Sequence, residues 1–552
     1  MNILNPRGAD AGVFNSVAFC PENWTIFVEM ITDLRALELQ ELPAFTKGLV
    51  DQVVARVRDK ITHLESSVAV AELTVALHYV LNTPEDVLIW DVGHQGYIHK
   101  ALTGRMEELA HMRTPGGISG FLKREESLYD FFGAGHASTS VSALTGVCVA
   151  DRAAGRERHR VAVIGDGSMT GGQSFEALNH LGNLGHNALV ILNDNDRSID
   201  PTMGALHAKG TYEEYVQSLG WSYAIVKEGN DVVSLVRAIE DQLRRDGPKV
   251  LHIRTKRPDL SAPKSYKPGT TFQWWAAEAM RDILMRHRDI RVLSPAMFAG
   301  SGFAPLRDDF ERQFLDTGIN EAHTVTTAAG MAAAGGRPWV HIYSTFLQRA
   351  YDQVVHDVVL QGLPVVFLVD RAGLVGTDGP THHGVFDQGL LMDLPGVVVW
   401  NPRNGEALRG MLEEVAENPP SGPIFIRYPK AKTEGARPMN FTPYEWLSKG
   451  DSKVLWVSTG AISDLIKNEG NHLHLAQIRP FFDDFAPILA EFDEIHVFEE
   501  STGLGGLGGG ITALVEGMVP RPKLVLHKLP STFIEHGPRL SLLKEHGFDP
   551  FL

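Results

Sequence analysis

The chain has 552 residues, 43% of them hydrophobic and 21% charged, and its formal net charge is −16 at pH 7. This composition is typical of globular proteins, and the length predicts about three domains. The negative balance, without any long run of Lys or Arg, argues against a nucleic-acid partner but is compatible with a local cationic pocket for a small phosphorylated molecule.

Cysteine use and the terminal segment predict an intracellular protein. The two cysteines, Cys20 and Cys148, lie in apolar segments, so we expect neither a disulfide framework nor a zinc site. The first residues, MNILNPRGADAG, lack the basic and apolar regions of a signal peptide, and no apolar run approaches the ~20 residues that cross a bilayer. We therefore expect cytoplasmic localisation and no membrane partner.

Short apolar strands alternate with helical patterns along the chain. The first set is VLIWDVG, VAVIGDG, ALVILND, WSYAIV and KVLHIRT, and a polar, Pro-rich stretch, KRPDLSAPKSYKPGTTF, follows it. A second set is RVLSPAM, PWVHIYS, PVVFLVD, GVVVWNP and PIFIRYP, and a third is KVLWVSTG, EIHVFEES and KLVLHKL. This alternation predicts an α/β protein with mostly parallel, doubly wound sheets. We place three α/β domains at residues 1–280, 281–435 and 436–552.

The run from residue 161 to 199 predicts a site for a diphosphate and its metal ion. A strand ends at Gly165-Asp166-Gly167, where glycines let backbone N–H groups approach a phosphate, and a helix whose N-terminus favours anions begins there. The next strand ends at Asn195, 29 residues after Asp166, and both side chains offer the oxygen ligands that Mg²⁺ prefers. GDG after one strand and NDN after the next is the pattern of a thiamine diphosphate site; the alternative is an ordinary βαβ turn.

Longer segments resemble one enzyme family. Residues 73–105, 116–127, 343–357 and 369–387 are similar to 1-deoxy-D-xylulose-5-phosphate synthases, more than to transketolases generally. The resemblance runs from about residue 60 to the C-terminus, whereas the first 45 or so residues resemble nothing specific. It implies a transketolase-like thiamine diphosphate-binding fold, with a diphosphate domain first, a pyrimidine-binding domain second and a transketolase C-terminal-like domain third.

The resemblance also implies which residues bind the cofactor. Glu321, before a helix of small residues, matches the catalytic glutamate that hydrogen-bonds the pyrimidine, although by itself it could be a carboxylate that interacts with the helix dipole. Phe346 matches the aromatic residue that packs on the pyrimidine; core packing is its alternative. The predicted metal ligands are Asp166, Asn195 and the backbone carbonyl of Arg197. The predicted cofactor-binding residues are His63, His94, His136, Gly165, Asp166, Gly167, Ser168, Asn195, Glu321 and Phe346.

Acid/base and substrate residues follow from the same resemblance. Neutral imidazoles can move protons beside the cofactor, and Asp378 can orient a substrate hydroxyl, whereas any single histidine could have an incidental role. A metal cluster at His382-His383 lacks supporting ligand spacing. The predicted catalytic residues are Glu321, His63, His136, His382 and Asp378. The predicted substrate-binding residues are Tyr343, Arg349, Arg371, Asp378, His382 and Lys430.

A second glycine motif, Gly503, Gly505 and Gly508, spells G-x-G-x-x-G between a strand and a helix. A dinucleotide site would require an acidic residue about 20 positions later, and Lys528 stands there instead. We interpret the motif as a tight strand-to-helix turn.

The sequence departs from the family mostly near the predicted acceptor pocket. Lys430 stands where the family usually has a second phosphate-binding arginine, and Gln273 replaces a histidine that reaches the active site; an amide cannot exchange protons as imidazole does. The connection from Ile199 to Trp221 is much shorter than in the family, and RTKRPDLSAP replaces a glycine-rich stretch. Glu65 adds a carboxylate near the cofactor.

By resemblance, the expected reaction is the thiamine diphosphate- and Mg²⁺-dependent joining of pyruvate to D-glyceraldehyde 3-phosphate, with loss of CO₂, to give 1-deoxy-D-xylulose 5-phosphate. One alternative uses the same cofactor on another aldehyde or transfers a ketol unit as transketolases do, without CO₂ release. A second alternative is a catalytically silent paralogue that acts in binding or assembly; retention of Asp166, Asn195 and Glu321 argues against it. We expect a homodimer.

Overall fold

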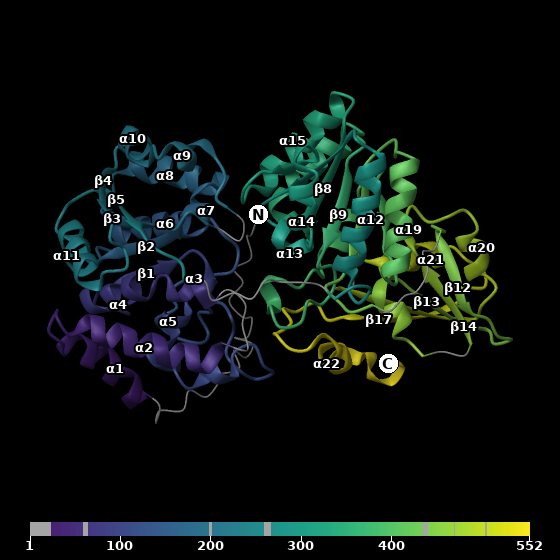
Figure 1. The fold of residues 1–552 in the computed structure, drawn as a ribbon. Helices are drawn as coiled ribbons and strands as arrows, with labels where there is room; N and C mark the ends of the chain where they lie inside the picture. The colour runs from purple at the N-terminus through teal and green to yellow at the C-terminus, as the bar shows by residue number, and fades with distance from the viewer. Residues whose placement is uncertain are drawn as a thin grey trace, which may run out of the picture.

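The computed structural model describes residues 24–58, 64–197, 201–258, 267–433, 440–467, 470–502 and 505–552, with side chains from residue 30 onward. The described strands form three sheets, two of five strands and one of seven. Figure 1 shows the first sheet with its helices on one side of the molecule and the other two sheets on the opposite side. The predicted α/β class with mostly parallel sheets is confirmed.

The first sheet is entirely parallel, in the order β1-β2-β3-β5-β4. Alternate residues of its strands enter two cores: Leu88, Val161 and Leu189 pack on one face, and Ile89, Ala162 and Val190 on the other. Both faces are therefore covered, as the continuous apolar strands predict. The strands are β1 (Val87–Trp90), β2 (Arg160–Gly165), β3 (Ala188–Asp194), β4 (Ser222–Val226) and β5 (Pro248–Arg254).

Two sets of helices cover the first sheet. The set on the first face includes α2 (Leu42–Val57), α4 (Ala71–Val80) and α11 (Val232–Leu243), and α1 (Trp24–Ala36) packs on it. The set on the second face includes α6 (Ser140–Ala153), α8 (Gly172–Leu184) and α10 (Tyr212–Ser218). Shorter helices carry loop residues: α3 (Leu64–Val68), α5 (Tyr97–Lys100), α7 (Asp166–Met169) and α9 (Ala205–Lys209).

The second sheet has the order β15-β10-β11-β9-β8-β6-β7, parallel except for β15. The strands are β6 (Ile290–Ser294), β7 (Phe314–Asp316), β8 (Arg337–Tyr343), β9 (Val366–Asp370), β10 (Val398–Trp400), β11 (Ile424–Tyr428) and β15 (Gln477–Arg479). The edge strands β7 and β15 were not predicted, because each has only three residues and lacks the apolar run that identifies the equally short β10. Residues of α12 (Phe272–Arg286) and α19 (Gly405–Glu417) pack on one face, and α15 (Glu321–Ala333) on the other.

The third sheet has the order β12-β14-β13-β16-β17, parallel except for β12. It shares one buried core with the second sheet, since Val340 and Phe367 belong to the same cluster as Val457 and Val497. The strands are β12 (Tyr444–Ser448), β13 (Val454–Ser458), β14 (Asn471–Leu475), β16 (Glu494–Thr502) and β17 (Lys523–Leu529). Helices α20 (Phe485–Leu489), α21 (Leu507–Glu516) and α22 (Arg539–Leu543) complete this region. Within the described residues, no helix is long and apolar enough to cross a membrane.

The glycine motif before α21 holds a carboxylate of the chain itself. The backbone N–H groups of Leu507 and Gly508 donate to the Glu499 carboxylate at 2.8 and 2.9 Å. A Cβ atom at position 506 would overlap the same carboxylate, so glycine is required there. Because Glu499 is 1% exposed and occupies the helix N-terminus, the place that a dinucleotide pyrophosphate would need is already filled. Gly503 lies outside the described residues.

Glu499→Ala should lower the free energy of unfolding by roughly 2–4 kcal/mol, because two buried N–H groups lose their acceptor and each unsatisfied group costs about 1–3 kcal/mol. Denaturant unfolding measures the difference. The matched control is Glu516→Ala, an exposed residue at the other end of the same helix, which should stay within about 0.5 kcal/mol of the parent. Equal stability of the two variants would contradict the capping role of Glu499.

Candidate active site

The predicted site residues gather where the carboxyl ends of two parallel sheets face each other. In the first sheet, β1 leads to His94, and β2 leads to Asp166 at the start of α7. In the second, β8 ends at Tyr343, and Arg371 follows the last residue of β9. Ligand sites of α/β proteins occur at the carboxyl ends of parallel strands, so the topology itself places these residues together.

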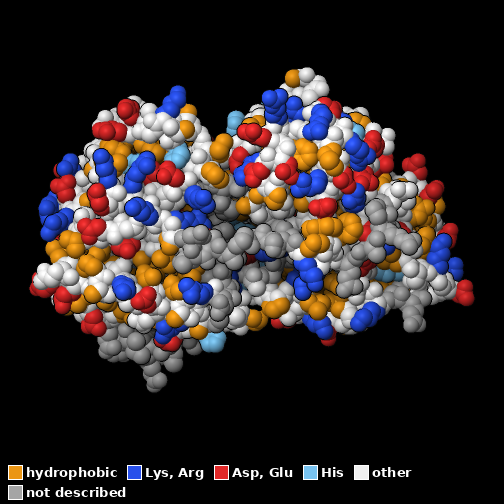
Figure 2. Space-filling view, in the orientation of Figure 1, with side chains coloured by type: hydrophobic (Ala, Val, Ile, Leu, Met, Phe, Trp, Pro, Cys, Tyr) orange, Lys and Arg blue, Asp and Glu red, His pale blue; other side chains and the backbone are white. Residues whose placement is uncertain are grey.

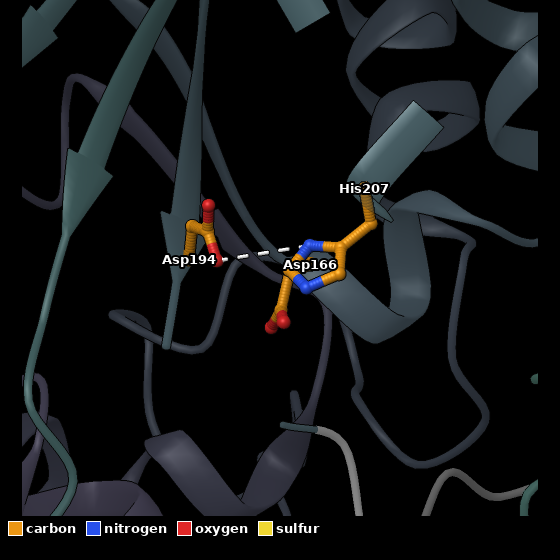
Figure 3. Close-up of side chains that lie close together, drawn as sticks. All are labelled: Asp166, Asp194 and His207. Atoms are coloured by element: carbon orange, nitrogen blue, oxygen red, sulfur yellow. Dashed lines mark ion pairs between the residues drawn. The ribbon is translucent and has the colours of Figure 1, made fainter. Parts of the chain in front are cut away.

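Asp166 lies in a cluster with two groups that the sequence analysis did not nominate. Ligand atoms of Asp166, Asp194 and His207 all lie within 4.8 Å of one another (Figure 3). Asp194 is the last residue of β3, and His207 comes from α9. Both carboxylates are 1% exposed. Two buried carboxylates beside an imidazole are a donor set suited to a divalent cation.

Burial dominates the electrostatics of Asp166. Desolvation raises its pKa to about 6, although a hydrogen bond from the Thr202 hydroxyl to Oδ2, 2.6 Å long, acts in the opposite direction. Asp194 differs, because its Oδ2 atom is paired with Arg254 at 3.3 Å and with His252 at 2.9 Å. A bound cation would offset the burial of Asp166.

The other residues of the predicted diphosphate and metal site form the turns after β2 and β3. Gly165, Gly167 and Ser168 belong to the β2–α7 junction, and the Ser168 carbonyl accepts bonds from the hydroxyls of Ser138 and Ser174. Asn195 is partly buried, and its Oδ1 accepts a bond from the N–H of Arg197 at 3.2 Å. Their roles toward a ligand stay predictions.

A chain of ring contacts joins the two sheets. The His94 ring lies 5.2 Å from Phe121, and Phe121 stacks on His382 at 5.3 Å. His382 and His136 both lie edge-on to Phe346, at 5.5 and 5.0 Å. The chain continues as Phe346 stacks on Tyr343 at 5.4 Å. Four of the predicted residues therefore share one aromatic wall with Tyr343, and Phe121 is a member that the sequence analysis missed.

Two buried contacts fix His136. The Asp91 carboxylate accepts the N–H groups of Ser138 and Ser140 at 2.7 and 2.9 Å, which holds the loop that carries His136. The imidazole Nε2 then donates to the carbonyl of Thr381 at 2.8 Å, across the junction of the two sheets. Asp91 carries no recognisable motif signal, so sequence reasoning did not find it.

Burial favours the neutral form of both central histidines. Burial lowers the pKa of His136, and desolvation lowers that of His382 to about 3 although Asp378 acts in the opposite direction. A neutral imidazole has one N–H donor and one lone pair, so it can give or take a proton without a prior change of charge. This fits the predicted acid/base role.

Glu321 is buried at the first position of α15 and is 4% exposed. Burial raises its pKa, while Arg349, whose Nε lies 3.4 Å from the carboxylate, lowers it by a smaller amount. Arg349 also donates to the Ala137 carbonyl at 2.8 Å. The predicted substrate arginine is thus positioned beside the predicted catalytic acid.

Asp378 joins two cations at the edge of the site. Arg113 donates to one carboxylate oxygen at 2.6 Å and Lys430 to the other at 2.8 Å. Burial raises the pKa of Asp378, but Lys430, His382 and Arg113 outweigh it and hold the pKa well below its usual range. Lys430 is half-exposed, so its ammonium group remains accessible while paired.

Arg371 is anchored by a buried network. Its guanidinium pairs with Asp370, donates to the Gly300 carbonyl at 2.8 Å and lies over the Tyr343 ring at 4.1 Å. Gln273, which departs from the family pattern, donates to Asp370 Oδ1 at 2.7 Å and to the Pro429 carbonyl at 3.1 Å. Gln273 therefore links the Arg371 anchor to the residue before Lys430.

A cavity of about 410 Å³ opens beside this constellation. Its wall includes Phe121, His136 and Asp378, together with the cations Lys123 and Arg124. A cavity of this size admits a small phosphorylated substrate.

Two expectations concern residues in the segment before α4. His63 lies outside the described residues. Glu65 is buried and pairs with Arg257, so the additional carboxylate is neutralised within the protein.

Comparison with known proteins gives consistent matches along the chain. A family profile described as 1-deoxy-D-xylulose-5-phosphate synthase matches residues 27–214, and one described as the transketolase pyrimidine binding domain matches residues 271–435.

Full-length relatives match as well. The chain is 36% identical to a 1-deoxy-D-xylulose-5-phosphate synthase of Methylobacillus flagellatus, over 94% of this chain and 96% of the relative. It is 36% identical to one of Aromatoleum aromaticum, over 94% and 95%, and 34% identical to one of Nitrosomonas europaea, over 95% and 97%. The first alignment has 593 positions, more than the 552 residues of this chain, so that relative contains insertions that this chain lacks.

Proposed function

The chain belongs to the 1-deoxy-D-xylulose-5-phosphate synthase family, and from this premise we propose how its own residues carry out the reaction. The protein is a thiamine diphosphate-dependent transferase that joins pyruvate to D-glyceraldehyde 3-phosphate with loss of CO₂. The observation that carries the residue assignment is the position of the buried Glu321 carboxyl. Glu321 pairs with Arg349, and Arg349 donates to the carbonyl of Ala137, the residue after His136. His136 and His382 in turn both contact Phe346.

The residues present fit thiamine diphosphate and Mg²⁺. Asp166 is a buried carboxylate for which the described residues supply no ion-pair partner, so a cation there removes an energetic cost. Glu321 is a buried carboxyl with a raised pKa, as a proton donor to the pyrimidine ring requires. When bound, the cofactor supplies the carbon nucleophile and the electron sink that the carboxyl carbon of pyruvate needs for its departure.

The protein's own side chains position the cofactor and substrate and exchange protons with them. Glu321 holds a proton at its carboxyl group, and Phe346 supplies a flat apolar surface for the pyrimidine. His136, with its Nε2 proton held by the Thr381 carbonyl, presents the Nδ1 lone pair. His382 is neutral and edge-on to Phe346, in position to exchange a proton with a substrate oxygen.

For the acceptor, we propose that Lys430 and Arg371 bind the phosphate and that Asp378 orients a hydroxyl. Arg371 is held rigidly by Asp370 and Tyr343, and Lys430 is half-exposed beside the cavity. Fixed donors lose little conformational entropy when the phosphate binds.

Two alternative functions differ from this one in the products they release or in the residues they require. Ketol transfer of the transketolase type would use the same cofactor but release no CO₂. A silent assembly protein would need neither the Glu321–Arg349 pair nor the neutral histidines, and their buried, mutually fixed arrangement favours an enzyme.

Glu321→Gln should lower turnover by about 10²–10⁴-fold, because an amide has no acidic proton to give to the pyrimidine. Steady-state kinetics with pyruvate and D-glyceraldehyde 3-phosphate measures the loss. Circular dichroism checks folding, and Glu311→Gln, an exposed glutamate near the same helix, serves as the control. Turnover of Glu321→Gln within a few-fold of the parent would remove Glu321 from the mechanism.

Lys430→Ala should raise the KM for D-glyceraldehyde 3-phosphate by about tenfold or more, since a charge-assisted contact contributes roughly 1.5 kcal/mol or more, and leave pyruvate saturation nearly unchanged. Lys430→Arg should tighten this acceptor by offering a bidentate donor. Lys430 is the better test than Arg371→Ala, because the latter would leave Asp370 buried without its cation.

The control for Lys430 is Lys432→Ala, an exposed lysine two residues further along the chain. Unphosphorylated D-glyceraldehyde provides the second comparison, and its KM should respond little to Lys430→Ala. If neither Lys430 variant changes the kinetics with D-glyceraldehyde 3-phosphate, Lys430 does not contact the phosphate.

We also propose that the protein is a cytoplasmic homodimer. In this type of enzyme the cofactor lies between the first two domains, and the third domain packs on a partner chain. Light scattering should give the mass of two chains at working concentration. Full activity of a species with the mass of one chain would contradict the dimer.

A further inference from the structure

His207 reaches the predicted metal site from the connection that is shortened relative to the family. It lies on α9, in the segment between residues 201 and 221 that follows Asn195. Figure 3 shows its imidazole ring beside the carboxylates of Asp194 and Asp166. This segment brings a nitrogen donor to a place where the sequence motif predicts only oxygens.

The contacts of His207 resemble those of a metal-binding histidine. Its Nδ1 atom lies 3.9 Å from Asp194 Oδ1, and its Nε2 atom lies 3.3 Å from Asp196 Oδ1. Histidines that bind metals commonly have a carboxylate on the nitrogen that does not face the ion, which orients the ring. The Tyr212 hydroxyl lies 3.3 Å from Nδ1, the nitrogen that faces the cluster, so a cation bound there would displace this contact.

The two carboxylates of the cluster are not equivalent. Asp194 is compensated by Arg254 and His252. Asp166, equally buried, makes no ion pair with any described residue, and the only side-chain hydrogen bond to it within that part of the chain comes from the Thr202 hydroxyl. A bound cation would supply the positive charge that this buried carboxylate lacks, and His207 faces the same space.

We propose that His207 supplies a nitrogen ligand to the divalent cation that Asp166 holds. The proposal rests on the proposed function, because the cation is the one that accompanies thiamine diphosphate. A nitrogen ligand changes the metal preference: imidazole binds Co²⁺ and later divalent ions more strongly, whereas Mg²⁺ favours oxygen. This chain should therefore discriminate in favour of Co²⁺ more than a site built from oxygens alone.

Calorimetric titration of Co²⁺ and Mg²⁺ into the full chain with thiamine diphosphate tests the proposal without measuring activity. His207→Ala should weaken Co²⁺ binding by at least about tenfold and Mg²⁺ binding by a smaller factor. The visible absorption bands of bound Co²⁺ should shift when the nitrogen is lost. His180→Ala, an exposed histidine on α8, is the control and should change neither affinity nor spectrum.

Two variants of Asp166 distinguish failure of the His207 proposal from failure of the proposed function. Asp166→Asn and Asp166→Ala should abolish tight binding of both ions, with folding checked by circular dichroism. If they do so while His207→Ala keeps the parent's Co²⁺ affinity and spectrum, or weakens both ions equally without a spectral change, His207 is not a ligand and the proposed function stands. If the Asp166 variants bind both ions as the parent does, the metal site itself is misplaced and both proposals fail.

Discussion

Burial of carboxylates at the junction of two parallel sheets is the constraint on which the site depends. Asp370 is held by Arg371 and Gln273, Asp378 by Arg113 and Lys430, and Glu321 by Arg349. Each of these contacts also fixes a cation or a proton donor that the proposed mechanism uses, so the same contacts compensate buried charge and preorganise the site. Asp166 differs from these three, because it has no ion-pair partner among the described residues, and we propose the metal ion there.

Buried carboxylates also fix two parts of the scaffold. Asp91 and Glu499 each accept two backbone N–H groups that would otherwise be buried without partners, one in the loop of His136 and the other at the start of α21. Each carboxylate thereby fixes the loop or turn whose N–H groups it accepts. The core shared by the second and third sheets includes Leu507 and Ile511 of α21, so it supports the turn that Glu499 fixes. Figure 2 shows charged side chains of both signs scattered over the face in view.

Local patterns in the sequence were sufficient for the fold class and for the first members of the site. Apolar strands alternating with helices predicted the parallel sheets, and the GDG turn placed Asp166 at the end of β2. Contacts between distant residues were not predictable: Arg113 meets Asp378 from 265 positions away, and Gln273 meets Asp370 from 97. His207 carried no spacing signal, because its proximity to Asp166 and Asp194 is set by how the segment after β3 folds. The sequence showed that Gln273 and Lys430 depart from the family pattern. It did not show that Gln273 donates a hydrogen bond to the carbonyl of Pro429, the residue before Lys430.

The most direct test of the account is the fate of the carboxyl carbon of pyruvate. The protein is incubated with thiamine diphosphate, Mg²⁺, D-glyceraldehyde 3-phosphate and pyruvate labelled with ¹³C at its carboxyl group, and gas and products are followed by mass spectrometry. The account predicts labelled CO₂ in equal amount to an unlabelled five-carbon ketose phosphate with the mass of 1-deoxy-D-xylulose 5-phosphate. Absence of labelled CO₂, with ketol transfer between sugar phosphates in its place, would contradict it.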